Sequence, residues 1–266
     1  MKSQEKRIKS GNYLEVELYP VTEHGHRHDR KRKLSRKEQQ RLNQKNAEKK
    51  LIRLINTNFG INDLLMHCTY RSDEMPNSEK EVLRDIKNYF RRINRYRKSH
   101  GMPRAKYIYV IECSSSGKWH WHGIMSGMNR NIAEELWGHG DFVNADRFQP
   151  TAQTGGEAFA KYISKKPMGK RRWNCSKKNL KKPTVKTKSS GYTRRGIARI
   201  ARERADDTRY WERKYKGYRL VSVTPVYNEF NGWWYIYVKM YRDTRGVNNN
   251  ERKQGNLSVL YERQSE

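Results

Sequence analysis

The stretch KYIYVIECSSSGKWHWHGIM, Lys106–Met125, decides the fold that the sequence predicts. Its first seven residues, KYIYVIE, are rich in the β-branched and aromatic side chains that strands favour. A polar segment, CSSSGK, separates them from WHWHGIM, a second run of aromatic and apolar residues. Two such runs joined by a short polar loop predict an antiparallel β-hairpin.

The second strand of this hairpin carries two histidines one residue apart, His120 and His122. Because side chains alternate along a strand, both imidazoles lie on one face, roughly 7 Å apart. Trp119, Trp121 and Met125 face the other way and can anchor the strand in the core. Two imidazoles spaced in this way can reach one metal ion at about 2.0–2.2 Å per bond. The alternative is that both histidines make ordinary hydrogen bonds in an aromatic strand.

A carboxylate lies on the first strand of the same hairpin. Glu112 shares its face with Ile108 and Val110, so the hairpin can bring it beside His120 and His122 as an oxygen ligand. Two nitrogens and one carboxylate leave positions for water or a phosphate oxygen. Such a set suits Mg²⁺ or Mn²⁺ acting on a phosphodiester better than a closed structural zinc.

A rival histidine pair lies near the N-terminus, at His26 and His28 in HGHRHD. These residues flank an arginine in a polar, charge-dense segment that has no strand pattern. A solvated, basic cluster explains this pair better than a metal site does.

Other segments around the hairpin show helical and extended patterns. They are a helix from Ser35 to near Gly60, a strand at Leu64–Tyr70, a helix from Ser78 to Gly101, a helix over IAEELWG, a strand over DFVNADRF, and a helix over EAFAKYISKK. The first two helices open on a serine with a glutamate three residues later, which is the capping-box spacing. This order predicts an α+β fold with a central antiparallel β-sheet and helices stacked on one face.

The last of these helices carries a candidate nucleophile. It is predicted to begin near Thr154 and to end at Pro167, and Lys165 and Lys166 follow Tyr162 at positions that share its face. Tyrosine is a weak nucleophile at neutral pH because its pKa is about 10. A neighbouring ammonium favours the phenolate, and a metal ion can polarise the phosphate under attack. The motif is weak by itself, since the chain has 17 tyrosines.

The composition indicates a nucleic-acid partner. The 266 residues carry a net charge of +30, and 34% of them are hydrophobic. So large a positive balance indicates binding to polyphosphate, and only less often to an anionic membrane surface. No apolar run approaches the roughly 20 residues that span a bilayer, and MKSQEKRIKS lacks the apolar segment of a signal peptide. We therefore expect a soluble, cytoplasmic protein with no membrane partner.

The three cysteines, Cys68, Cys113 and Cys175, are odd in number and form no CxxC motif. We expect reduced thiols, because neither a zinc ribbon nor a disulfide framework is supported.

Three regions are expected along the chain. Residues 1–34 are predicted to form a basic N-terminal arm, residues 35–183 the main domain, and residues 184–266 a basic segment with a C-terminal β-hairpin that can pack on the main domain. The hairpin is predicted around Asn231-Gly232. Its second strand, WWYIYVKMY, is expected to be core or sheet edge in preference to a base-reading platform.

A basic stretch follows the candidate nucleophile. The residues expected to contact DNA there are Lys161, Lys166, Lys170, Arg171, Arg172 and Trp173. Trp173 and Tyr192 can stack on bases. A flexible basic linker that adds only nonspecific affinity is an equally good account. In both cases binding should weaken steeply with salt, because each neutralised phosphate releases counterions.

Taken together, these motifs resemble the HUH endonuclease superfamily, in particular the replication initiators of rolling-circle plasmids, phages and integrative elements. The matching motifs are His120-Trp121-His122, Tyr162 with Lys165, the strand MHCTY at Met66–Tyr70, and the acid Glu112. The resemblance covers roughly Glu48 to Pro183. It is specific in the combination of its motifs, although no single motif is specific.

The resemblance implies both a fold and a reaction. A central antiparallel sheet would present the histidines, and a helix would bring Tyr162 over them. Tyr162 would attack an origin phosphodiester in single-stranded or hairpin DNA, giving a 5′-phosphotyrosine and a 3′-hydroxyl that primes synthesis. Mg²⁺ or Mn²⁺ would be the cofactor. Conjugative relaxases and single-strand transposases use the same chemistry, and a noncatalytic basic nucleic-acid-binding protein is the alternative from another class.

The sequence departs from relatives of this kind in two respects. The position four residues before Tyr162 is Ala158, so only one tyrosine occupies the catalytic helix. There is also no GxxxxGK[ST] phosphate loop, since Gly117-Lys118 is followed by Trp119. Unwinding is therefore expected to come from a separate helicase and host replication proteins.

Overall fold

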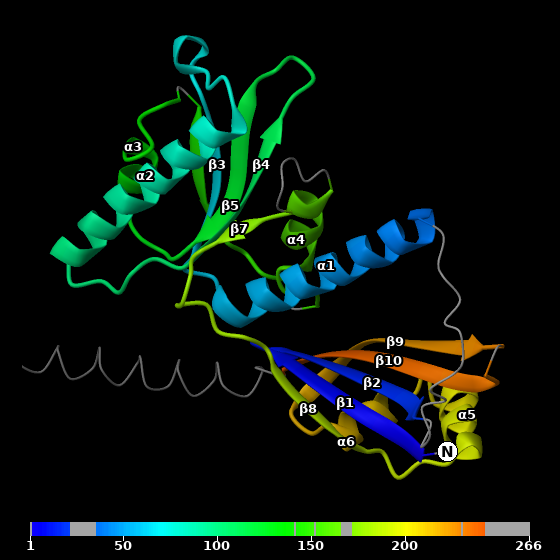
Figure 1. Cartoon of the computed structure of the whole chain (residues 1–266). Coiled ribbons are helices and arrows are strands. Elements are labelled where there is room, and N and C mark those ends of the chain that lie inside the picture. Colours follow the sequence, from blue (N-terminus) through cyan, green and yellow to red (C-terminus); the bar gives the residue numbers. More distant parts are fainter. Residues whose placement is uncertain are drawn as a thin grey trace, which may run out of the picture. The chain divides into compact units, whose positions relative to one another are not determined.

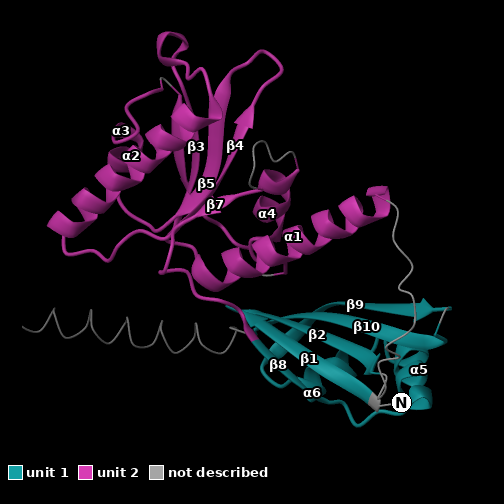
Figure 2. Cartoon of the chain, viewed as in Figure 1, with its two compact units in different colours: residues 1–26, 185–266 teal, residues 27–184 magenta. Residues whose placement is uncertain are grey.

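A computed structural model describes residues 2–21, 36–140, 142–151, 153–165, 172–229 and 231–242. The chain forms two compact units (Figure 2). Unit 1 combines residues 1–26 with 185–266, and unit 2 comprises residues 27–184.

Unit 2 is built on an antiparallel sheet of five strands in the order β6-β3-β5-β4-β7 (Figure 1). The strands are β3 (Leu64–Thr69), β4 (Tyr107–Cys113), β5 (Trp119–Met125), β6 (Val143–Arg147) and β7 (Asn174–Cys175). β4 and β5 form the predicted hairpin, and their register pairs Glu112 with His120. β5 lies in the middle of the sheet, so both of its edges are hydrogen-bonded. The predicted α+β fold with a central antiparallel sheet is confirmed.

Helices cover both faces of this sheet, so the prediction that they stack on one face was wrong. They are α1 (Arg36–Asn58), the 3₁₀ helix η1 (Ser72–Glu74), α2 (Glu79–Ser99), α3 (Arg130–Glu135) and α4 (Glu157–Ser164). α2 and α3 pack on the face that carries Trp121, whereas α1 and α4 pack on the face that carries Ile108 and Val110 (Figure 1). The reason is that β4 is apolar on both sides, with four consecutive buried residues, and a strand of this kind needs cover on each face.

The helix boundaries follow local signals. Ser78 caps α2 by accepting a hydrogen bond from the Glu81 backbone N–H, as predicted, and Gly101 follows the helix at φ +66°. α4 begins at Glu157, later than predicted, and Gly156 is its N-cap. Gly156 is required there because a Cβ would lie 2.6 Å from the Ile55 side chain of α1. The predicted cap at Ser35 and the predicted stop at Pro167 lie outside the described residues.

Unit 1 contains a second antiparallel sheet, in the order β8-β1-β2-β10-β9. Its strands are β1 (Lys2–Ser10), β2 (Tyr13–Val21), β8 (Thr184–Ser189), β9 (Tyr218–Asn228) and β10 (Trp233–Arg242). The helices α5 (Arg194–Glu203) and α6 (Thr208–Lys214) pack on this sheet and share one core with β2 and β10. β9 and β10 form the hairpin predicted around Asn231-Gly232.

Two expectations for this unit need correction. The predicted N-terminal arm, residues 1–34, is wrong for residues 2–21, which form the β1–β2 hairpin. The segment LEVEL alternates apolar and acidic residues, and Leu14, Val16 and Leu18 are buried on one face. The flexible-linker account is also wrong for α5, because Ile197 and Ile200 of this basic helix are buried.

The cysteines are free thiols, as expected, and all three lie in strands. Among the residues that the structure describes, no helix is long and apolar enough to cross a membrane.

Candidate active site

The sheet of unit 2 brings the predicted metal ligands together. Because Glu112 and His120 are paired across the hairpin, the Oε2 of Glu112 lies 3.4 Å from the Nε2 of His120 and 4.0 Å from the Nε2 of His122. One ligand atom from each of the three residues lies within 4.8 Å of the others. The predicted convergence of these side chains is confirmed.

The opposite face of β5 holds the histidine strand in place. Trp121 is fully buried against α2, and its ring packs edge-on to that of Trp137. Gly123 also faces this side, where a Cβ would lie 2.8 Å from the Ile108 carbonyl oxygen. Tight packing on this face fixes the direction in which the histidines project on the other.

The two imidazoles differ in their surroundings. His122 is buried, whereas the side chains of His120 and Glu112 are each about a quarter exposed. The Nδ1 of His120 lies 3.4 Å from the Lys118 carbonyl oxygen, so Nδ1 can carry the proton and leave the Nε2 lone pair facing Glu112. The site therefore offers one sheltered and one accessible nitrogen beside a carboxylate.

Burial lowers the pKa of His122 to about 4, and the neighbouring His67 and His120 add to the effect. A neutral imidazole is the form that binds a metal ion. Two imidazole nitrogens and one carboxylate oxygen are donors that divalent transition-metal ions accept. The residues present therefore fit a divalent metal ion.

The shifted pKa predicts how stability depends on pH in the metal-free protein. His122 has an ordinary pKa of 6.5 when unfolded and about 4 when folded, so the unfolded chain takes up a proton first as pH falls. The free energy of unfolding should therefore decrease as pH falls from 6.5 towards 4, by about 2 kcal/mol between pH 7 and pH 5. Urea denaturation in EDTA at the two pH values measures this loss.

His122→Gln should lose a large part of this pH dependence, whereas His100→Gln, at the exposed end of α2, should retain it. Equal pH dependence in wild type and His122→Gln would assign the effect to another group.

A third histidine, which the sequence analysis did not single out, completes the imidazole cluster. The ring of His67 on β3 stacks on that of His122 at a centroid distance of 4.3 Å and lies 5.8 Å from that of His120. Burial lowers the pKa of His67, with His120 contributing. The signal was present in MHCTY, where alternation puts His67 on one face with Leu65. The pairing of β3 with β5, which sets His67 opposite His122, has no local signature.

The candidate nucleophile lies over this cluster. Tyr162 projects from α4, and its ring meets that of His122 edge to face at a centroid distance of 5.2 Å. Ala160 and Ile163 of α4 are fully buried against the sheet, whereas Tyr162 is 50% exposed. The helix is thus anchored by its apolar residues, and its tyrosine is accessible beside the histidines.

The predicted DNA contacts are placed only in part. Lys161 and Lys165 are exposed on α4, and the ammonium of Lys161 lies 2.6 Å from Glu157. Arg172 donates a hydrogen bond to Gln44, and Trp173 packs partly buried against the core between the sheet and α1. Much of the Trp173 ring is therefore used in packing. Lys166, Lys170 and Arg171 lie outside the described residues, as do His26 and His28.

A comparison with protein families gives one match. The sequence model of a family described as replication-associated protein, ORF2 type, matches residues 63–167. These residues run from β3 to just beyond α4 and include Glu112, the three clustered histidines and Tyr162. The match supports a family of replication initiators and an interaction with DNA. No curated protein and no solved structure matches the chain.

Proposed function

We propose that this protein is a metal-dependent, sequence-specific DNA nicking and joining enzyme of the HUH endonuclease type that initiates rolling-circle replication. One observation carries the proposal, namely that the Tyr162 ring lies 5.2 Å from that of His122, beside the Glu112–His120–His122 cluster. DNA binding alone does not require a half-exposed tyrosine beside two imidazoles and a carboxylate.

The cluster has the task of holding a divalent ion, Mg²⁺ or Mn²⁺. Glu112, His120 and His122 would be its ligands, and a bound ion would polarise the phosphate and stabilise the charge that develops on its oxygens. His67, stacked on His122, fixes the ring plane of that ligand. The hydrogen-bonded strands on both sides of β5 keep the ligands in register.

Tyr162 has the task of attacking phosphorus. Its phenol releases a proton to water, and the resulting oxygen forms a bond to the phosphorus of one phosphodiester. The bond from phosphorus to the 3′ oxygen breaks, and that oxygen takes up a proton from water. The products are a 5′-phosphotyrosine and a free 3′-hydroxyl, and joining is the reverse reaction. Lys165, three residues along the chain from Tyr162, favours the phenolate by its positive charge.

The family match favours replication over the other roles that share this chemistry. Conjugative relaxases and single-strand transposases would use the same residues, but the match is to a replication-associated family. The 3′-hydroxyl would then prime leading-strand synthesis, with unwinding supplied by a separate helicase.

The proposal predicts a covalent protein–DNA adduct. Labelled single-stranded DNA taken from the sequence around the gene should shift to the mass of the protein on denaturing electrophoresis when Mn²⁺ is present, and not in EDTA. If no fragment of that DNA is cleaved with Mn²⁺ or Mg²⁺, the proposed nicking activity is wrong. The binding of DNA can be measured separately in that case.

A further inference from the structure

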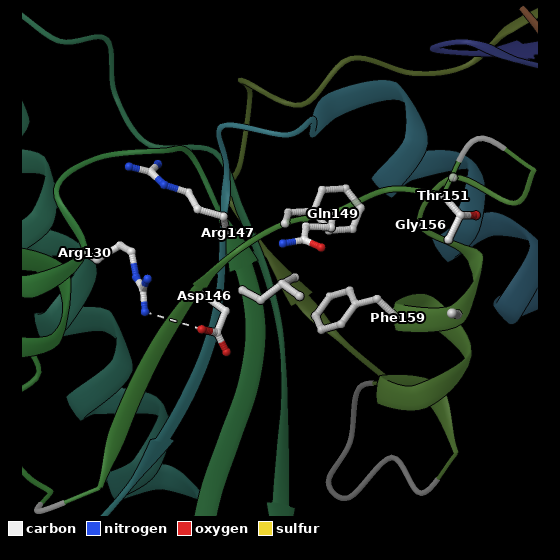
Figure 3. Close-up of a pocket in the computed structure, with 11 residues that line it drawn as sticks. Arg130, Asp146, Arg147, Gln149, Thr151, Gly156 and Phe159 are labelled. Carbon is white, nitrogen blue, oxygen red and sulfur yellow. Dashed lines mark hydrogen bonds and ion pairs between the residues drawn. The ribbon is translucent and has the colours of Figure 1, made fainter.

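A cavity of about 520 Å³ adjoins the candidate active site on the face of the sheet that carries the histidines (Figure 3). Its walls come from β3, β6, the segment after β6, α4 and the start of α3. We call it the flanking pocket, and the lining residues used below are Leu65, Arg130, Asp146, Arg147, Gln149 and Phe159.

Two elements connect the flanking pocket to the reacting residues. On β3, Leu65 lies two residues before His67, so both side chains point to one face about 7 Å apart. On α4, Phe159 lies three residues before Tyr162, which makes the two side chains neighbours on the helix surface. A DNA strand with its phosphate at Tyr162 therefore reaches this pocket within a nucleotide or so.

The flanking pocket has a positively charged wall. Arg130 is held by the carboxylate of Asp146, 3.4 Å away, and by the Ala145 carbonyl. The Nη1 of Arg147 donates to the Asn62 carbonyl at 2.9 Å, and a guanidinium carries five N–H donors in all. Arg147 therefore has donors left for a phosphate while its position is fixed from behind.

The remaining walls offer what an unstacked base requires. Phe159 and Leu65 supply an aromatic and an apolar surface, and Phe159 is backed by the buried Phe148 at a ring distance of 6.4 Å. The Asp146 carboxylate and the Gln149 amide lie on the same cavity and present acceptors and a donor (Figure 3). Proteins read unstacked bases by stacking them on aromatic side chains and by hydrogen-bonding their edges.

The pocket wall is also rigid. The Gly156 N–H donates to the Asn56 side chain of α1 at 2.7 Å, and a Cβ at Gly156 would come within 3.0 Å of the Phe148 ring. The start of α4 is therefore pressed against α1 and the segment after β6. A site fixed in this way loses little freedom when a ligand binds.

We propose that the flanking pocket binds one nucleotide of single-stranded DNA next to the phosphate that Tyr162 attacks. The base stacks on Phe159 and is read by Gln149 and Asp146, and Arg147 contacts a phosphate. The position relative to the cleaved bond rests on the proposed function, but the binding of a nucleotide does not.

The test uses the full-length chain in a Tyr162→Phe background, which keeps the DNA uncleaved. A pool of random 30-nucleotide single-stranded DNA is selected for binding, and the bound fraction is sequenced. The test variants are Phe159→Leu, Gln149→Ala and Arg147→Ala. The matched control is Arg91→Ala, which removes an exposed arginine of α2 on the opposite face of the sheet. Thermal melting of each variant shows whether it is folded.

The expected result is a preferred sequence in the parent protein that loses its base preference at one position in Phe159→Leu and Gln149→Ala. An abasic nucleotide at that position should weaken binding to the parent about 5- to 100-fold and should have little further effect on Phe159→Leu. Arg147→Ala should weaken binding to all sequences and reduce the slope of log K against log salt by about 0.7.

The proposal is overturned if folded Phe159→Leu and Gln149→Ala keep the parent's full preference, or if the parent shows no base preference. The same holds if the abasic effect is equal in the parent and Phe159→Leu. These readouts use binding alone, so a failure of DNA cleavage by the wild-type protein would refute the proposed function without deciding the fate of the pocket.

Discussion

Replacing Tyr162 by phenylalanine should abolish the covalent adduct and reduce cleavage of single-stranded origin DNA by at least about 10³-fold. The substitution removes one oxygen, the atom that would bond to phosphorus, from a ring that is half exposed beside His122. Because the ring itself remains, the affinity for DNA should stay within about twofold of the wild type, which is within the range of a neutral surface substitution.

A matched control is available in unit 1. Tyr227 is 47% exposed, close to the 50% of Tyr162, and it lies on β9. Tyr227→Phe should form the adduct at the wild-type rate. An adduct that persists in Tyr162→Phe at a comparable rate would place the nucleophile elsewhere in the chain.

Replacing His120 by alanine should weaken binding of Mn²⁺ by more than about 100-fold and remove metal-dependent cleavage, because loss of a direct ligand costs more than loss of a residue behind it. His120 supplies one of two nitrogens in the cluster, and its Nε2 faces Glu112 at 3.4 Å. The electron paramagnetic resonance signal of free Mn²⁺ measures binding directly, without DNA and without turnover.

His139 provides the control for this experiment. It also forms a histidine–carboxylate pair in unit 2, with its Nδ1 2.9 Å from Glu74, but it lies outside the Glu112–His120–His122 cluster. His139→Ala should bind Mn²⁺ as the wild type does. Undiminished Mn²⁺ binding by His120→Ala, or full cleavage in chelator, would show that the cluster is not the metal site.

The residues of the candidate site could be predicted because each depends on a local period. Alternation along two strands joined by one loop is enough to bring Glu112 to His120, and a turn of helix is enough to relate Tyr162 to Lys165. The placement of Tyr162 over the histidines was implied only by the family resemblance. The metal, the nucleophilic role and the basic DNA track stay predictions.

The parts that the sequence analysis missed depend on long-range pairing. His67 reaches His122 because β3 pairs with β5 across more than fifty residues of chain, and nothing in MHCTY specifies that partner. The N-terminal hairpin is stabilised by β10, whose Val238 lies opposite Val16. Its net charge hid an alternation that only the distant strand gives a reason to bury. Cover on both faces of β4 likewise comes from α1 and α4, which precede and follow it in the chain.

The most direct measurement is mass spectrometry of the adduct after protease and nuclease digestion. A single-stranded substrate is cleaved with Mn²⁺, and the peptide that retains a nucleotide is sequenced. We predict a nucleotide joined through its 5′ phosphate to Tyr162, in a peptide from α4. A nucleotide on another tyrosine, or cleavage that leaves no peptide-linked nucleotide, would contradict the account.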